Sequence, residues 1–327
     1  MSNTILEYVW LGANNELRSK TKVVKGDVSL VAEMPLWSFD GSSTEQAPGN
    51  HSDCILKPIK AYPNPFHVMT VNDYYLVMCE VFNDDSNKRV EIKNDSQTYW
   101  FGFEQEYFIY RHGRPLGWPA SSDAMPQGPY YCGVGAENVA GRTLVDEHMQ
   151  MCLHAGIRIT GTNAEVALGQ WEYQVFGTSQ KGAADDLWMS RYILERLGEQ
   201  FGFVINFEPK PIKGDWNGSG LHTNFSTDAM RTNSSMGYYQ DILSKMNDRH
   251  EEHIAVYGKD NDKRLTGKHE TQSIDKFTYG EGDRGASIRI PVETIDAGYK
   301  SGYLEDRRPA SNADPYEITK VIIDTIT

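Results

Sequence analysis

The sequence has no run of about 20 apolar residues, the length that an α-helix needs to cross a bilayer. Its first residues, MSNTILEYVWLG, lack the basic segment and apolar stretch of a secretory signal. We therefore expect a cytoplasmic location. The cysteines form no Cys-x-x-Cys pair, which favours reduced, packed thiols over a disulfide framework or a zinc site. They are Cys54, Cys79, Cys132 and Cys152.

Clusters of basic residues are scarce as well. The formal net charge is −13 and no Lys or Arg block is present, which argues against nucleic acid as a partner. The sequence also has no Gly-x-x-x-x-Gly-Lys loop, so other groups would have to hold a nucleotide's phosphates. Five arginines nevertheless lie between Arg264 and Arg308. They indicate either a site for small anions or surface ion pairs with neighbouring acids.

The 327 residues, 39% hydrophobic and 24% charged, are typical of a folded globular protein. This length allows a small domain and a larger one. The first part reads as strands and turns, with ILEYVWLG, ELRSKTKVV and YYLVMCEVF as the clearest strands. The polar stretch 84–94 is the best linker candidate, and we predict domains at 1–82 and 83–327.

The second domain mixes short strands with amphipathic helices. Apolar residues at helical spacing predict helices over 143–153 and 185–201, and Gly156 is suited to end the first. A longer helix is expected over about 236–257, and a last one begins at Asp314, a cap residue followed by proline. Because strands and helices do not alternate regularly, we predict an α+β fold.

The segment WFGFEQEYFIY, 100–110, has the period of a strand. Phe101, Phe103 and Tyr107 would point one way, while Glu104 and Glu106 would share the other face. A Glu-x-Glu pair is usually the solvated side of an edge strand. Here, however, aromatic residues surround two carboxylates that would repel one another unless a cation lay between them.

Further candidate ligands follow along the chain. A turn at 168 and 169 predicts a hairpin that brings Glu165 and Glu172 to the same side of a sheet, unless their spacing is accidental. His222 begins a strand after a glycine-rich stretch, and Glu305 lies beside two arginines; a structural histidine and a surface charge cluster are the alternatives. Together, five glutamates and one histidine favour hard ions such as Mg²⁺ or Mn²⁺, and suffice for two of them. Such a site could hold phosphates without a phosphate-binding loop.

Two charged residues near the C-terminal end of the chain suggest further roles. Arg289 alternates with Ile288 and Ile290, so it projects from the polar face of a strand, where it could neutralise a phosphate. Glu270 lies in a segment without periodicity that follows Arg264, as expected of a mobile loop. It is either exposed to solvent or, if the loop closes over a reaction intermediate, able to take a proton from an amine nucleophile.

Nine motifs in order, spread over 35–315, carry a resemblance to a known family. They are FDGSST (39–44), FEQEY (103–107), PQGPYYCGVG (126–135), GTNAEV (161–166), QWEYQ (170–174), NGSGLHTNFS (217–226), RLTGKHET (264–271), RGASIRIP (284–291) and YLEDRRPASNADP (303–315). The chain resembles the type II, eukaryotic-like glutamine synthetases. The resemblance implies an N-terminal β-grasp domain and a catalytic α+β domain with a curved, mainly antiparallel sheet. It also implies a decamer of two stacked pentameric rings, with active sites between neighbouring subunits.

The resemblance also implies roles for individual residues. Glu106, Glu165 and Glu172 would bind one divalent metal ion, Glu104, His222 and Glu305 another, with two or three Mg²⁺ or Mn²⁺ per site. Arg264, Arg284 and Arg307 would hold glutamate and the transferred phosphoryl group, Asn217 and Gly218 would contact glutamate, and Arg289 and Arg308 would lie near the phosphates. Trp100, Ser226 and Tyr303 would frame ATP. Asp40 and Ser43 of a neighbouring subunit would form the ammonium site with Tyr131 and Glu270.

The implied reaction joins ammonia to glutamate through γ-glutamyl phosphate, with Asp40 and Glu270 as proton acceptors and arginines stabilising the transferring group. A γ-glutamyl-amine ligase with a bulkier amine, or an inactive nitrogen sensor, are the alternatives. The sequence departs from the family in VFGTSQKG, 175–182, next to the expected nucleotide site, and its C-terminus is short, which could alter subunit contacts.

Overall fold

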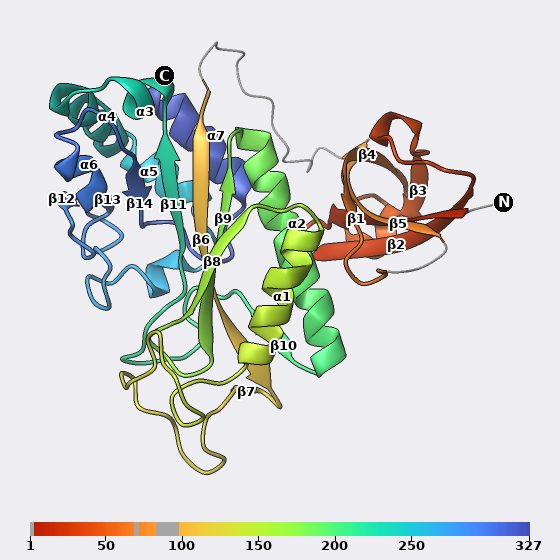
Figure 1. Ribbon diagram of the computed structural model, residues 1–327, viewed down its shortest axis with the longest axis horizontal. Helices are drawn as coiled ribbons and strands as arrows, with labels where there is room; N and C mark the ends of the chain where they lie inside the picture. Colours follow the sequence, from red (N-terminus) through yellow and green to blue (C-terminus); the bar gives the residue numbers. More distant parts are fainter. Residues whose placement is uncertain (1–2, 69–71, 83–97) are drawn as a thin grey trace. The chain divides into compact units, whose positions relative to one another are not determined.

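The computed structural model describes residues 3–68, 72–82 and 98–327, and these fall into two compact units. The first unit contains the N-terminal strands together with Gln150–Ile157 and Trp188–Ile193, and the second contains most of the remaining chain. The predicted linker and the predicted boundary between residues 82 and 83 fall on 83–97, outside the described residues. Strands and helices both occur without regular alternation, so the predicted α+β class is confirmed (Figure 1).

The first unit is built on a five-stranded sheet in the order β2-β1-β5-β4-β3. The central strands β1 and β5 run parallel, and the other neighbours are antiparallel. The three strands expected here from their apolar patterns are β1, β2 and β5. The elements of the sheet and its two short 3₁₀ helices are β1 (Asn3–Leu11), β2 (Leu17–Lys25), η1 (Val31–Glu33), β3 (Trp37–Asp40), η2 (Gly41–Thr44), β4 (Asp53–Pro63) and β5 (Asp73–Phe82).

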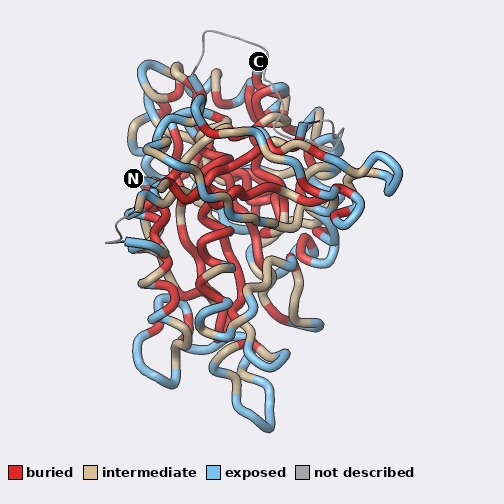
Figure 2. The backbone as a smooth tube through the Cα atoms, turned by 90° about the vertical axis from the view of Figure 1, so that its right-hand side faces the viewer, coloured by how far each residue is buried: buried red, intermediate tan, exposed pale blue. Residues whose placement is uncertain are grey.

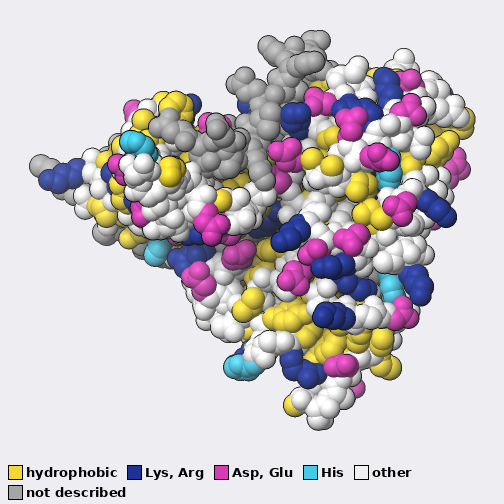
Figure 3. All heavy atoms as spheres, turned by 180° about the vertical axis from the view of Figure 1, so that it is seen from behind, with side chains coloured by type: hydrophobic (Ala, Val, Ile, Leu, Met, Phe, Trp, Pro, Cys, Tyr) yellow, Lys and Arg dark blue, Asp and Glu magenta, His cyan; other side chains and the backbone are white. Residues whose placement is uncertain are grey.

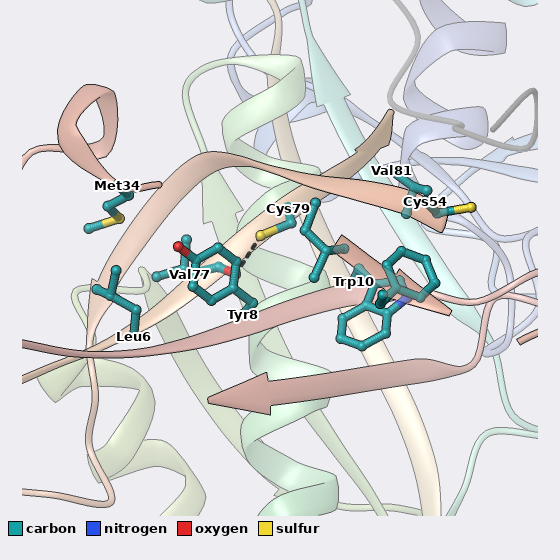
Figure 4. Packing of buried hydrophobic residues seen from close by; sticks show 10 residues of the cluster. Leu6, Tyr8, Trp10, Met34, Cys54, Val77, Cys79 and Val81 are labelled. Atoms are coloured by element: carbon teal, nitrogen blue, oxygen red, sulfur yellow. Dashed lines mark hydrogen bonds between the residues drawn. The ribbon is translucent and has the colours of Figure 1, made fainter. Parts of the chain in front are cut away.

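The core of this unit is aromatic and aliphatic. Tyr8 and Trp10 on β1 pack with Val77 and Val81 on β5, and Trp10 lies 4.8 Å from the ring of Phe39 (Figure 4). The predicted packing role of the cysteines holds for Cys54, Cys79 and Cys152, which are buried, whereas Cys132 is exposed. Each large side chain buried here contributes roughly 1.5–3 kcal/mol to folding.

The second unit is organised around a nine-stranded sheet. Its main order is β12-β13-β14-β11-β6-β9-β8, with β7 and β10 also pairing with β6. Every pair is antiparallel except β12 with β13, as expected from the resemblance. The strands are β6 (Trp100–Arg111), β7 (Arg114–Pro115), β8 (Ile159–Ala164), β9 (Gln170–Gly177), β10 (Val204–Asn206), β11 (Leu221–Ser226), β12 (Tyr279–Glu281), β13 (Ile288–Ile290) and β14 (Leu304–Asp306).

The helices lie where the sequence pattern predicted them, but some of them begin or end at other residues than predicted. The terminal helix begins as expected, because Asp314 accepts a hydrogen bond from the Tyr316 amide and Pro315 is the first helical residue. Both α4 and α5 pack on it. The helices are α1 (Arg142–His154), α2 (Gln180–Phe201), α3 (Asp228–Thr232), α4 (Met236–Asp248), α5 (His250–Val256), η3 (Asn261–Lys263), α6 (Val292–Asp296) and α7 (Pro315–Ile326).

Two helix predictions need correction. Helix α2 starts five residues before the predicted position 185, because the Ser179 side chain caps it by accepting from the Gly182 amide. The helix predicted over 236–257 is two helices, α4 and α5, interrupted at Arg249. That residue has φ −110° and ψ 22°, and its guanidinium donates to the carbonyl oxygen of Asp324 at 2.6 Å.

Buried residues run through the interior strands and helices, and exposed ones gather in the connecting segments (Figure 2). On the face drawn in Figure 3, basic and acidic side chains are interspersed rather than segregated by sign. Across the described ranges, none of the helices combines the length and the apolar character that a bilayer span requires.

Candidate active site

Three adjacent strands bring the predicted carboxylates together. On β6, Glu104 lies opposite His222 of β11, and Glu106 lies opposite Glu172 of β9. Since directly opposite residues of antiparallel strands point to the same face, these side chains converge on one side of the sheet. Glu305 joins them from β14, the next strand beyond β11.

The hairpin of β8 and β9 supplies the other carboxylate. Its turn is 165–169, with Gly169 at φ +88°, and Glu165 lies just after the end of β8. The Glu165 amide donates to the Gln170 carbonyl oxygen at 2.9 Å, which keeps Glu165 in register with β9. Glu172 itself is opposite Asn163. Glu165 and Glu172 therefore share a face as diagonal rather than directly opposite neighbours.

The carboxylates form two overlapping groups. One ligand atom from each of Glu106, Glu165 and Glu172 lies within 4.8 Å of the others, and the same holds for Glu104, Glu172 and His222. Glu172 belongs to both groups. The resemblance implied Glu305 as the third ligand beside Glu104 and His222; Glu305 lies 3.5 Å from His222 Nδ1 and also pairs with Arg289 and Arg307.

Because the carboxylates are buried close together, their ionised forms are unfavourable unless a positive charge lies between them. Burial raises the pKa of Glu106 to about 7 and that of Glu165 to about 8. The pKa of Glu172 is also raised well above its usual range, first by burial and then by the carboxylates of Glu104 and Glu165. For His222, burial and the positive charge of Arg307 lower the pKa, which keeps the imidazole neutral and able to bind a metal ion.

The protein satisfies only part of the hydrogen-bonding capacity of these groups. Glu106 accepts from the Gly220 amide at 2.7 Å, Glu165 from the Val166 amide at 3.0 Å, and Glu104 from the Asn224 side chain at 2.8 Å. Each carboxylate has two oxygens with about four acceptor positions. Several buried carboxylate oxygens with spare acceptor capacity and one neutral imidazole fit hard divalent cations.

Four arginines line the same cavity. Glu305, 1% exposed, accepts from Arg289 at 2.7 Å and from Arg307 at 2.6 Å. The Arg307 Nε atom also donates to the Arg284 carbonyl oxygen at 3.0 Å. The cavity has a volume of about 600 Å³. Its lining includes all six predicted metal ligands, four arginines and two substrate-loop residues: Glu104, Glu106, Glu165, Glu172, His222, Glu305, Arg264, Arg284, Arg289, Arg307, Asn217 and Gly218.

Two arginines predicted to contact substrate are more deeply buried than a surface loop would place them. Arg264 is 5% exposed, and its guanidinium donates to the backbone carbonyl oxygens of Arg307 and Arg308 at 3.0 and 3.3 Å. It still lines the cavity. Burial lowers the pKa of Arg264 to about 10. Arg308 does not line the cavity, because its side chain is committed to Asp306 on the other side of β14.

Glycine is required where the chain approaches Arg264. A Cβ atom at Gly220 would lie 2.4 Å from the Arg264 guanidinium and 2.9 Å from His222 Nε2. At Gly218 it would lie 2.6 Å from the Pro209 carbonyl oxygen. All three distances are below van der Waals contact, so any larger residue would displace these neighbouring groups.

A second, more apolar pocket adjoins the first. It has a volume of about 930 Å³ and shares Glu104 and Gln174 with the carboxylate cavity. The predicted nucleotide-framing residues Trp100, Ser226 and Tyr303 all line it. The departing segment 175–182 contributes Val175 and Phe176, and the Phe176 ring meets Trp100 edge-on at 5.6 Å.

Several residues that line the two pockets were not among the site residues predicted from the sequence. Arg231 on α3 lies 4.3 Å from the Trp100 ring centre and donates to the Ser226 carbonyl oxygen at 2.7 Å. Gln174 donates to Glu172, and Asn224 donates to Glu104. For Gln174 and Asn224 the strand period was a usable signal, since each lies two residues from a predicted ligand. No local pattern pointed to Arg231.

The remaining predicted residues divide between the two units. Tyr131 is exposed and lines the carboxylate cavity, as does Glu270. Asp40 and Ser43 lie in the first unit and are not among the residues that line the cavity; Asp40 accepts from the hydroxyls of Ser42 and Ser43, each at 2.7 Å. These bonds lower the pKa of Asp40 to about 2.

Comparisons with known proteins agree with this arrangement. The β-grasp domain of glutamine synthetases matches residues 5–84, and their catalytic domain matches residues 87–255. The chain is similar to the glutamine synthetase of Bradyrhizobium diazoefficiens, with 51% identity over all of this chain and 97% of that protein. It is 50% identical to the Neurospora crassa enzyme over 98% of this chain and 91% of that one. Plasmodium falciparum glutamine synthetase shares its fold, with TM-score 0.77 at 17% identity over 98% of this chain and 71% of that chain.

Proposed function

This chain belongs to the glutamine synthetase family, and from that membership we propose how its own residues carry out the family's reaction. It is a glutamate–ammonia ligase. It couples ATP to the ligation of ammonia to L-glutamate through γ-glutamyl phosphate, and releases L-glutamine, ADP and phosphate. The observation that carries the assignment of residues is a single cavity lined by six glutamates, one buried imidazole and four arginines.

Divalent ions are held by the two overlapping groups of ligands. Glu106, Glu165 and Glu172 would bind one ion, and Glu104, Glu172 and His222 would bind a second, with Glu305 beside His222. We assign Mg²⁺ or Mn²⁺, two or three per site, because the donor atoms are mostly carboxylate oxygens. When bound, these ions supply positive charge that offsets the charge on the phosphate oxygens of ATP.

Glutamate and the transferred phosphoryl group lie against the arginine wall. Asn217 and Gly218 contact glutamate from one side, while Arg264, Arg284 and Arg307 hold its carboxylates and the phosphoryl oxygens. The guanidinium of Arg307 is already fixed by Glu305, so little reorientation is needed as charge develops on the phosphoryl group. Arg289, fixed by the same carboxylate, lies near the phosphates.

ATP occupies the apolar pocket. Trp100, Tyr303 and Ser226 frame the base and sugar, and Arg231 stiffens the Trp100 ring by lying over its face. The phosphates then point toward Glu104, which lines both pockets. Arg308 is not included in this assignment, because its buried pairing with Asp306 keeps it out of both cavities.

The ammonium site combines residues of two subunits. Tyr131 and Glu270 come from this subunit, and Asp40 and Ser43 come from another copy of the chain in a homo-oligomer, which we propose is a decamer. Asp40 remains ionised at all physiological pH values, because hydrogen bonds lower its pKa to about 2. It therefore binds ammonium and helps to remove its proton. Glu270 takes the proton released when ammonia attacks the acyl phosphate.

A nucleotide-coupled amine screen tests this function. The full-length protein is supplied with ATP, Mg²⁺ and glutamate, and phosphate and amide product are measured with ammonium, methylamine or a polyamine. Ammonium should give much the highest rate, with glutamine as product. A preference for a larger amine would indicate a γ-glutamyl-amine ligase, and no turnover with any amine would indicate an inactive sensor.

A further inference from the structure

His269 and Asp215 connect the loop that carries Glu270 to the segment before β11. The His269 Nε2 atom lies 2.9 Å from Asp215 Oδ1. An ionised carboxylate has no hydrogen to donate, so Nε2 carries it. The hydrogen bond and charge of His269 lower the pKa of Asp215, and Lys268 and Lys210 act in the same direction. Asp215 is therefore an ionised acceptor.

The loop backbone needs external support at its tip. His269 has φ 54° and Glu270 has φ 57°, two consecutive non-glycine residues in the left-handed region. Such conformations persist where surrounding contacts hold them in place. Thr271 closes the loop locally by donating to the Lys268 carbonyl oxygen at 2.7 Å. The Glu270 side chain is 62% exposed and only 3.8 Å from Arg307 at its nearest, so it does little to hold the tip.

Asp215 is a firm anchor in spite of its own exposure. The next residue, Trp216, is buried and stacks on Trp118 with ring centres 4.7 Å apart. The Lys210 ammonium donates to the Trp216 carbonyl oxygen. Asn217 and Gly218 follow and line the carboxylate cavity. A bond to Asp215 therefore ties the loop tip directly to the cavity wall.

We propose that Asp215 is a positioning residue that holds His269, and through it keeps the Glu270 carboxylate over the mouth of the cavity. The inference rests on the proposed function, with the loop that carries Glu270 closed over γ-glutamyl phosphate so that water is excluded. Without the bond, the tip leaves its left-handed conformation part of the time and water reaches the γ-glutamyl phosphate. The water oxygen then bonds to the acyl carbon, the bond from that carbon to the phosphate oxygen breaks, and glutamate, phosphate and a proton are released.

The measurement is the ratio of phosphate released to glutamine formed, with saturating ATP, Mg²⁺, glutamate and ammonium. Asp215→Ala should raise this ratio about twofold to fivefold, the range expected for one exposed charged contact. Asp324→Ala, which breaks the exposed pair of Lys320 and Asp324 on α7 at 2.6 Å, is the matched control and should leave the ratio at the wild-type value. Asp215→Asn, a smaller change, should act in the same direction.

A double-mutant cycle separates a shared bond from two independent effects. His269→Ala should raise the ratio, and Asp215→Ala combined with His269→Ala should raise it no further than the larger single effect. A wild-type ratio in Asp215→Ala, or effects that multiply in the double variant, would overturn the proposal. If the wild-type protein made no glutamine, the proposed function itself would be refuted. The same assay shows this, because it measures glutamine formed by the wild type as well as by the variants.

Discussion

Asp306 accepts two hydrogen bonds from the Arg308 guanidinium, at 2.9 Å from Nε and 2.7 Å from Nη2, and both side chains are almost fully buried. Along the same strand and its continuation, Glu305 and Arg307 point to the cavity. Side chains alternate across a strand, so the two buried partners lie on the opposite face. The pair therefore fixes the segment that presents Glu305 and Arg307 to the site.

Removal of one partner of this pair should destabilise the protein strongly. Arg308→Met leaves the Asp306 carboxylate buried without its counter-charge, which costs about 3–5 kcal/mol in the free energy of unfolding. Urea unfolding followed by fluorescence measures this change. Lys320→Ala is the control, since its pair with Asp324 is about one-third exposed and should contribute roughly 1 kcal/mol or less. Equal effects of the two variants would contradict the structural role of the buried pair.

A histidine in the same network should make stability depend on pH. Burial lowers the pKa of His253 to about 3, with Arg308 adding to the shift, and its ring bonds Tyr257 and Thr325. The unfolded chain binds a proton near pH 6.5, whereas the folded protein does not until about pH 3. The contribution of His253 to the free energy of unfolding is therefore full above pH 6.5 and is lost as pH falls toward 3, with a slope of up to about 1.4 kcal/mol per unit.

The variant His253→Gln removes this titration and should flatten the pH dependence between 6.5 and 5. His51→Gln is the control, because His51 is exposed and its removal should leave the slope unchanged. Urea unfolding at several pH values gives the two slopes. If the free energy of unfolding of wild-type protein and of His253→Gln fell equally as the pH was lowered, the pH dependence could not come from His253.

Strand periodicity predicted which of the site's carboxylates share a face of the sheet. It could not predict how neighbouring strands are aligned with one another. The period of two placed Glu104 and Glu106 on one face, and the turn at Gly169 brought Glu165 to the side of Glu172. The sharing of Glu172 between two ligand groups did not follow, because it depends on the register of β9 with both β6 and β8. Local spacing carries no information on that register.

The placement of arginines was less accessible to sequence reasoning. Arg307 and Arg308 are adjacent, yet one lines the cavity and the other is buried behind it, because strand alternation sends them to opposite faces. Arg231 comes from a helix of five residues that no periodic pattern marks. At the break between α4 and α5, Arg249 donates to the carbonyl oxygen of Asp324, 75 residues away, a contact that the continuous helical pattern of 236–257 did not reveal.

Glu172 should matter more for metal binding than a ligand of a single ion, since it belongs to both groups. Glu172→Gln keeps the size of the side chain but removes its charge, and should weaken Mn²⁺ binding by about tenfold or more at two positions. Titration calorimetry with Mn²⁺ measures the affinity at each of the two positions. Asp146→Asn, an exposed change on α1, is the control. Loss of only one binding event would show that the groups do not share this carboxylate.

The role of Glu270 can be separated from that of the arginines. Glu270→Ala should leave glutamate-dependent release of phosphate from ATP largely intact and reduce glutamine formation about 100-fold, the typical contribution of a positioned proton acceptor. Both products are measured in one reaction. An equal loss of phosphate and glutamine would place Glu270 in the first step and remove its role as proton acceptor.

Gly220 tests whether the close approach of backbone, Arg264 and His222 is needed for the site. In Gly220→Ala the new methyl group meets Arg264 at 2.4 Å and His222 at 2.9 Å, and both of these buried side chains line the carboxylate cavity. Overpacking of this kind costs about 1–3 kcal/mol, and the displaced imidazole should also weaken Mn²⁺ binding. In Gly49→Ala the methyl group meets no atom within 4 Å, so unfolding and Mn²⁺ binding should stay as in the wild type. Because both variants add the same group, a Gly220→Ala protein with normal Mn²⁺ affinity would mean that His222 is not held in place by this contact.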